Sequence, residues 1–182
     1  MAYFNNRAED WERLDWQILR DGGISLYWRA EYLAEDAQWL SNHDYNLYDF
    51  DCATWVSRED MFSDFGRALH FPEWWGRNFD ALDDCITELE LPESPGAAIV
   101  LRHFDVYAFH AEARTLPSGE TEAVVLLDML ASASRFHLLN GRRLVVLVQS
   151  DDPELTLKKL GGKIPQWNHR EWLNENRRPS SR

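Results

Sequence analysis

The sequence predicts an α/β fold in which helices pack on a small parallel β-sheet. Two segments, AAIVL at 97–101 and LVVLV at 144–148, are unbroken apolar runs, and such runs are typical of strands buried on both faces of a sheet. Segments with helical periodicity separate the predicted strands, as the crossover connections of a parallel sheet require. A chain of 182 residues, 45% of them hydrophobic, is long enough to bury one good core.

Helices and strands alternate in the first fifty residues. The spacing of apolar residues predicts helices over 8–20 and 29–40, which end at the turn sequences DGG and SNHD. The intervening segments ISLYW at 24–28 and NLYDFDC at 46–52 have the composition of short strands.

The remaining helices are marked by their ends. Ser57 and Asp60 form a capping-box pattern, so a helix is expected to begin there and to end before Pro72. A short helix is expected over 104–113 and a long one over 121–139. In the C-terminal tail, WNHREWL indicates a short helix that docks on the body through its two tryptophans, Trp167 and Trp172.

Charge separates the tail from the rest of the chain. The whole chain has a formal charge of −12 and residues 158–182 carry +5, which leaves −17 for residues 1–157. An acidic body is suited to a cationic partner, whereas a nucleic-acid binder needs a basic stripe that the tail alone could supply. Solubility is the alternative explanation of the acidity. We divide the chain into an N-terminal extension at 1–45, a main domain at 46–150 and a basic tail at 151–182.

Many functional classes have no motif in this sequence. GxGxxG, GxxxxGK[ST], HExxH and GxSxG are all missing, so we expect no catalytic residues and no cofactor. Cys52 and Cys85 have no CxxC spacing, and His103 and His110 fit surface or helix-end positions, so no metal site is expected. With no apolar run of membrane-spanning length and no signal-peptide pattern, we expect a cytoplasmic protein.

The segment FPEWWGRNFDALDDCITEL, residues 71–89, predicts an amphipathic helix with an acidic front. On a helical wheel, Leu82 and Ile86 fall on one side, and Asp80, Asp83 and Asp84 fall on the other. Like charges on adjacent turns repel by a few tenths of a kcal/mol per pair. The acidic cluster therefore does not serve to stabilise the helix.

The loop before this helix combines aromatic residues with a glycine. Trp74 and Trp75 can expose flat apolar area next to the carboxylates, and Gly76 lets a partner approach the backbone closely. Asn78 is placed to act as the N-cap of the helix. The alternative is that one or both tryptophans cap the core and that the acids form a solvated face.

This segment closely resembles the signature of the barstar family, small intracellular inhibitors of ribonucleases. In the family, Pro-Glu-aromatic-aromatic-Gly-x-Asn-apolar-Asp-Ala-Leu-x-Asp-Cys-apolar opens the nuclease-binding helix. The positions in register are Pro72, Glu73, Trp74, Trp75, Gly76, Asn78, Asp80, Ala81, Leu82, Asp84 and Cys85. The resemblance extends from about Asn46 to Ser150 and implies a barstar-like fold, with an N-terminal helical extension and one possible added strand at 24–28.

The resemblance also implies how the protein would act. The loop and the acidic helix would plug the basic active site of an extracellular-type ribonuclease or a nuclease toxin, with carboxylates in place of RNA phosphates. Trp74 would cover the mouth of that site, and Asp80 and Asp84 would pair with the cations that hold the substrate. The protein would be an immunity protein that contacts neither nucleic acid nor membrane. The predicted partner-binding residues are Trp74, Trp75, Gly76, Asn78, Asp80, Asp83 and Asp84.

The chain also departs from the family pattern. Asp83 stands where an aromatic residue is familiar, and 131–134 of the long helix contain no acid where the family can offer another carboxylate. These departures and the extra length leave open a barstar-like interaction module that no longer binds a nuclease. A magnesium-dependent hydrolase that uses Asp80, Asp83 and Asp84 is a third alternative, although three carboxylates on one exposed helix face do not make a closed octahedral site.

Overall fold

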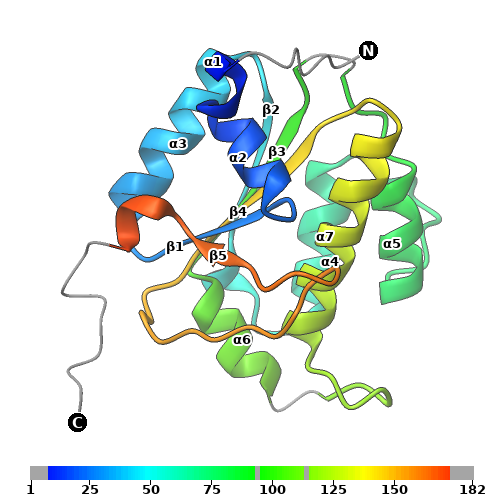
Figure 1. Cartoon of the computed structure of the whole chain (residues 1–182). Coiled ribbons are helices and arrows are strands. Elements are labelled where there is room, and N and C mark those ends of the chain that lie inside the picture. The colour runs from blue at the N-terminus through cyan, green and yellow to red at the C-terminus, as the bar shows by residue number, and fades with distance from the viewer. Residues whose placement is uncertain (1–7, 93–94, 113–114, 173–182) are drawn as a thin grey trace, which may run out of the picture.

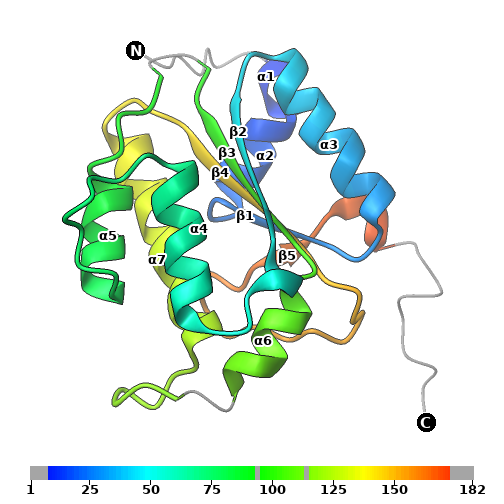
Figure 2. The ribbon, with the colours of Figure 1, turned by 180° about the vertical axis from the view of Figure 1, so that it is seen from behind.

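The computed structural model describes residues 8–92, 95–112 and 115–172, and these segments form a parallel β-sheet covered by helices on both faces (Figures 1 and 2). The strands lie in the order β2-β3-β4-β1-β5. This arrangement confirms the predicted α/β class. The strands are β1 (Ile24–Tyr27), β2 (Asn46–Asp51), β3 (Ala97–Arg102), β4 (Leu144–Gln149) and β5 (Gln166–Trp167).

The helices agree with most of the predicted segments. The α-helices are α1 (Ala8–Trp11), α2 (Leu14–Arg20), α3 (Ala30–Asn42), α4 (Arg58–Ala68), α5 (Phe79–Thr87), α6 (Phe104–Glu112) and α7 (Glu122–Leu139). Two 3₁₀ turns, η1 (Cys52–Thr54) and η2 (His169–Glu171), complete the list. The capping box of α4 is present, with reciprocal bonds between Ser57 and Asp60. None of the helices in the described segments combines the length and apolarity needed to cross a membrane.

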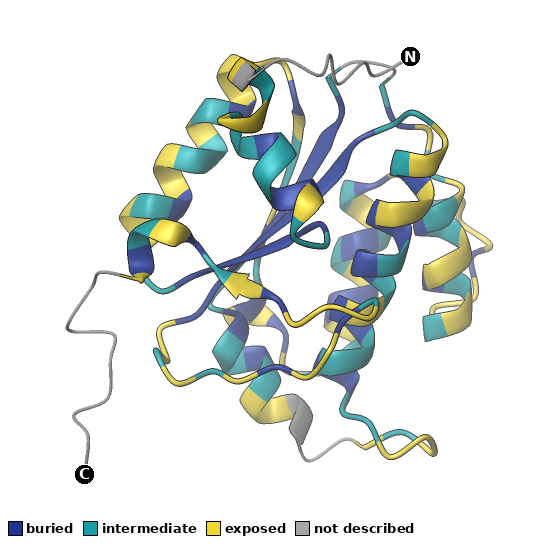
Figure 3. Cartoon of the chain, in the orientation of Figure 1, coloured by how far each residue is buried: buried dark blue, intermediate teal, exposed yellow. Residues whose placement is uncertain are grey.

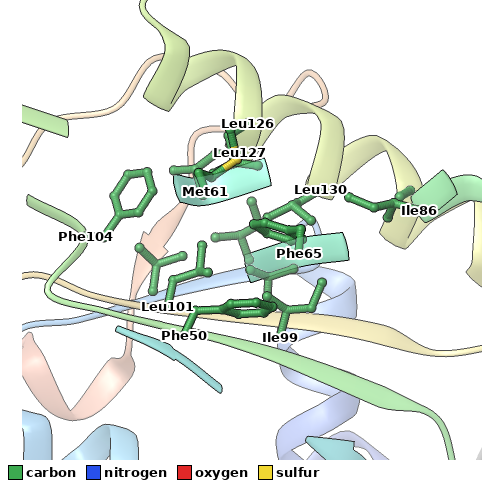
Figure 4. Packing of buried hydrophobic residues seen from close by; sticks show 14 of the residues in the cluster. Phe50, Met61, Phe65, Ile86, Ile99, Leu101, Phe104, Leu126, Leu127 and Leu130 are labelled. Carbon is green, nitrogen blue, oxygen red and sulfur yellow. The ribbon is translucent and has the colours of Figure 1, made fainter. Parts of the chain in front are cut away.

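One face of the sheet packs against helices α4, α5, α6 and α7. Figure 4 shows this core in close-up, where side chains of β2 and β3 meet those of α4 and α7. Phe50 and Phe65 stack at 4.6 Å between ring centroids, and the Trp55 ring lies 5.9 Å from Phe50 and 5.8 Å from Phe65. The labelled core residues are Phe50, Met61, Phe65, Ile86, Ile99, Leu101, Phe104, Leu126, Leu127 and Leu130.

The opposite face of the sheet packs against the N-terminal helices. Val145 and Leu147 of β4 point to this side and lie in one buried cluster with Ile18 of α2 and with Leu33 and Leu40 of α3. In Figure 2 these helices lie across the sheet from α4, α5 and α7. β1 pairs with β4 in parallel and so extends the sheet beyond the strand at 144–149.

The helix predicted over 8–20 is two helices with a break at Arg13, which has an extended backbone. The break places Asp15, which is fully buried, in a charged cluster. Asp15 accepts hydrogen bonds from Arg13 at 2.8 and 3.0 Å, from the Tyr45 hydroxyl at 2.7 Å and from Arg143 at 2.9 Å. Burial alone would raise the pKa of Asp15, but these bonds outweigh it and hold the pKa below its ordinary value.

Replacement of Asp15 by asparagine is expected to lower the free energy of unfolding at pH 7 by about 3 kcal/mol, because two arginines lose a buried counter-charge. Since the folded-state pKa is depressed, the contribution is present above the ordinary pKa of 3.8 and is lost as the pH falls through the folded-state value. Urea unfolding from pH 7 to pH 2 measures both effects. Asp21→Asn, which breaks an exposed pair with Arg20, is the control and should cost less than about 1 kcal/mol. Equal stabilities for Asp15→Asn and the control would contradict the assigned role.

The C-terminal segment up to residue 172 is built into the fold. The Asn168 amide donates to the Leu26 carbonyl at 2.7 Å beside the short pairing of β5 with β1. The Glu171 carboxylate is buried and accepts from the amides of Trp28 and Arg29 at 3.1 and 2.9 Å. Because Arg29 is the N-cap residue of α3, Glu171 satisfies backbone donors at the start of that helix.

Ion pairs hold the same segment on the acidic body. Arg170 pairs with Asp36 at 2.5 Å and with Glu35 at 2.6 Å. The predicted short helix is the single turn η2; Trp167 packs partly buried against the core, whereas Trp172 is 52% exposed. About half of the Trp172 side chain is therefore covered by the rest of the protein. Asn168 and Glu171 are the most buried polar residues in the described part of the tail, 151–172.

We expect Glu171→Ala to lower the free energy of unfolding by roughly 2–3 kcal/mol, because it leaves the amides at the start of α3 without their acceptor. Lys158→Ala, which removes a pair with Glu120 on the protein surface, should cost at most about 1 kcal/mol. Thermal unfolding of the two variants side by side gives the comparison. A Glu171→Ala variant as stable as Lys158→Ala would show that the bonds from Glu171 to the amides of Trp28 and Arg29 contribute little to stability.

Candidate functional site

Helix α5 has one buried and one exposed face. Leu82 and Ile86 are almost completely buried in the core, and Asp80, Asp83 and Asp84 are exposed. Figure 3 shows exposed residues along the outer side of this helix. The three carboxylates that the sequence placed together therefore share one surface.

The start of α5 is held by its N-cap. The Asn78 side chain accepts a hydrogen bond from the Ala81 amide at 2.9 Å and donates one to the Gly76 carbonyl at 3.2 Å. A Cβ atom on residue 76 would lie 2.9 Å from the Asn78 amide nitrogen and 3.3 Å from the Ala81 Cβ. A side chain at residue 76 would thus collide with the Asn78 cap, so the glycine is explained by the packing within the protein as well as by the expected approach of a partner.

The far end of α5 is fixed to α7. His137 is buried and its Nε2 lies 2.8 Å from the Ile86 carbonyl oxygen. Burial lowers the pKa of His137, so the neutral ring donates this bond at pH 7. The bond satisfies a carbonyl in the last turn of α5 and ties the acidic helix to the longest helix of the fold.

Four carboxylates gather where α5 and α7 meet. Partial burial raises the pKa of Asp83, and the negative charges of Asp84, Asp80 and Asp128 raise it further. Asp128 belongs to α7, one turn before the region 131–134 in which the sequence offered no acid. Asp128 could not be predicted from the sequence, because only the packing of α5 on α7 brings it near Asp83. Asp128 also accepts a hydrogen bond from the Gly161 amide at 2.7 Å.

The two tryptophans of the loop have different environments. Trp74 is 85% exposed, more than any other aromatic side chain of the described residues. Trp75 is only 8% exposed. The Trp75 ring makes edge contacts with Phe62 at 5.7 Å and with Phe71 at 5.2 Å. Both tryptophans were predicted to bind a partner, but the structure presents Trp74 at the surface and packs Trp75 into the core.

The backbone of this loop is constrained at both ends. His70 and Arg77 have φ values of 56° and 44°, a left-handed conformation that costs a non-glycine residue about 1–2 kcal/mol. His70 follows the C-cap of α4, and the next amide, of Phe71, donates to the Gly66 carbonyl at 2.9 Å, as in a Schellman motif. A second bond, from the Trp75 amide to the Pro72 carbonyl at 2.9 Å, closes a turn within the loop. The loop is thus ordered by its own bonds and by the anchored indole.

Metal and nucleophile candidates are not assembled at this surface. In the segments that the structure describes, no group of three or more His, Cys, Asp or Glu side chains is arranged to hold a metal ion. Cys52 is buried and Cys85 is partly buried; both are free, and burial raises the pKa of each thiol. His103 lies at the end of β3, where its Nδ1 is 2.8 Å from the Asp51 carboxylate. The exposed carboxylates of α5 can pair with cationic side chains of another protein, and the loop before α5 offers an exposed indole.

The fold and this surface define an α/β protein that presents an acidic helix and, in the loop that leads into it, an exposed aromatic residue. A family model described as Barstar (barnase inhibitor) matches residues 45–149, which is more than half of the chain. The chain therefore belongs to the barstar family, whose members bind and inhibit ribonucleases such as barnase. The comparison with curated proteins finds no match.

Replacement of Asp83 by asparagine is expected to raise the free energy of unfolding at pH 7 by a few tenths of a kcal/mol, because it relieves repulsion among neighbouring acids. The raised pKa means that the folded state holds this proton more tightly than the unfolded chain. Stability of the parent therefore falls as the pH rises through the ordinary pKa of 3.8 toward the folded-state value. The advantage of the variant should vanish below about pH 3, where the carboxyl is protonated in both states. Urea unfolding at pH 3 and pH 7 tests this, and a variant less stable than the parent at pH 7 would refute it.

Proposed function

We propose that this protein acts in the cytoplasm as a non-enzymatic inhibitor of a basic ribonuclease, which it blocks with α5 and the loop before it. The observation that carries the proposal is the exposed row of Asp80, Asp83 and Asp84, together with Trp74, which is 85% exposed on the ordered loop that leads into α5. Carboxylates in this arrangement offer the negative charge that a ribonuclease active site otherwise finds in RNA phosphates.

The charges of the acidic row support a binding role. No salt bridge of the described residues involves Asp80, Asp83 or Asp84, whereas buried acids elsewhere in the fold, such as Asp15 and Glu122, are paired with arginines. Unpaired negative charge attracts a cationic partner over several ångströms and speeds its association at low salt. Because the chain belongs to the barstar family, the proposed partner is a basic ribonuclease of the extracellular type or a nuclease toxin.

The rigid attachment of the row also supports this function. The N-cap at Asn78 holds the start of α5, and the bond from His137 to Ile86 holds its end. A surface that does not rearrange loses little conformational entropy when it binds. The same features would serve the alternative, an interaction module that binds another cationic protein and no nuclease. The two functions are separated by ribonuclease inhibition.

The experiment measures the activity of a panel of small basic ribonucleases of the barnase type with increasing amounts of the protein. Asp84→Ala is expected to weaken inhibition most, by about 2–5 kcal/mol in binding free energy, because the nuclease cations would be left buried and unpaired. Its melting temperature should be unchanged or slightly raised, since Asp84 is exposed and has acidic neighbours. Trp74→Ala should also weaken inhibition without unfolding the protein.

Glu31→Ala is the matched control, because it removes an exposed acid from α3 on the other side of the sheet. It should inhibit as well as the parent protein. If the folded parent inhibits none of the ribonucleases, or if Asp84→Ala and Glu31→Ala inhibit equally, the acidic helix is not a nuclease plug and the interaction module replaces the proposed function. A pull-down from the cell's own lysate at low and high salt then identifies the cationic partner.

A further inference from the structure

Helix α4 contains a glycine at the point where Trp75 lies against it. Gly66 is in the last turns of α4, and its φ does not lie in the left-handed region. The backbone there is open to any residue, and alanine would favour the helix more than glycine does. A Cβ atom on residue 66 would, however, lie 2.8 Å from Nε1 and 3.2 Å from both Cε2 and Cζ2 of Trp75. The absence of a side chain leaves the space in which the indole lies.

The Trp75 ring has little freedom to move away from such an atom. It is 8% exposed, and Phe62 and Phe71 contact it in nearly perpendicular orientations, at interplanar angles of 89° and 73°. Closely packed interiors transmit a local displacement instead of absorbing it. A methyl group at residue 66 would therefore shift the indole and the loop to which it belongs.

We propose that Gly66 is a positioning residue of the binding surface: it admits the Trp75 indole into the side of α4, and the seated indole fixes the loop that presents Trp74. This inference rests on the proposed function for its effect on a nuclease. It assigns different tasks to the two adjacent tryptophans. Trp75 is the internal anchor, and Trp74 is the exposed contact.

The geometry links the anchor to the exposed residue in two ways. Trp74 and Trp75 share a planar peptide group, so a rotation or shift of one Cα carries the other with it. The Trp75 amide also closes the turn on the Pro72 carbonyl, and the same loop bonds back to α4 through the Gly66 carbonyl. Gly66 thus contacts the loop in two ways: its carbonyl oxygen accepts from the Phe71 amide, and the Trp75 indole lies where a side chain of residue 66 would be. If the Trp75 indole no longer packed against Gly66, the backbone at His70 and Arg77 could leave its left-handed conformation.

The test compares Gly66→Ala, Trp75→Phe and the double variant with the parent protein. Ser63→Ala, an exposed position of the same helix, controls for the gain in helix propensity. Amide hydrogen exchange of residues 70–78 in the free protein reports the order of the loop, and titration with an inhibited ribonuclease reports affinity. Gly66→Ala should speed exchange in the loop and weaken binding by about tenfold, a typical coupling between residues in contact. Phenylalanine lacks the benzo ring of the indole, so its smaller ring has room to move away from the added methyl group, and the double variant should bind and exchange as Trp75→Phe does.

The outcomes separate this inference from the proposed function. If the parent inhibits a ribonuclease and Gly66→Ala matches Ser63→Ala in both measurements, the positioning role is overturned and the proposed function stands. If the parent inhibits no ribonuclease, the proposed function fails, and the exchange measurement alone decides whether Gly66 seats the loop. If Gly66→Ala changes the Trp75→Phe protein as much as it changes the parent, the added methyl group does not act through the indole, and the inference is wrong. If Gly66→Ala does not fold, Phe71→Leu loosens the other side of the indole and should give the same faster exchange without added volume.

Discussion

The structure depends on the need to cover both faces of the central sheet. Five of the six residues of β3 and all six of β4 are buried, so neither face of these strands meets water. Each buried valine, leucine or isoleucine contributes about 1.5–3 kcal/mol, and an open face would forfeit that contribution along both strands. Helices α4 to α7 cover one face, and α2 and α3 cover the other. Helices α2 and α3 are thus part of the core, and the contacts of Asp15 and Glu171 hold them in place.

The same core allows α5 to carry charges that oppose its own stability. Repulsion between acids on adjacent turns costs a few tenths of a kcal/mol per pair, whereas burial of Leu82 and Ile86 contributes several times as much. The apolar back therefore determines that the helix forms, and its exposed front is free to be selected for binding. The same division operates in the loop, where the Trp75 indole is buried and its neighbour Trp74, the proposed contact, is exposed.

Local patterns in the sequence were enough to predict most of this fold. The apolar runs became β3 and β4, the capping box opened α4, and Asn78 capped α5 as its position indicated. The features that could not be predicted depend on residues far apart in the chain. The break at Arg13 places Asp15 where it bonds to Tyr45 and Arg143. Strand β5 forms by pairing with β1, and Asp128 lies near Asp83 because α5 packs on α7. The burial of Trp75 likewise needed the positions of Phe62 and Gly66, which no periodicity encodes.

The distribution of paired and unpaired charge follows from this architecture. Within the described segments, cations of the tail are used internally: Lys158 pairs with Glu120, and Arg170 pairs with Asp36. These pairs lie on α3 and before α7, so they neutralise acids of the body and leave the row on α5 without a counter-charge. A partner that brings cations to α5 consequently replaces no internal salt bridge of that row. In the proposed complex, the Coulomb attraction of the row is set against the desolvation of its carboxylates and not against the loss of an internal salt bridge.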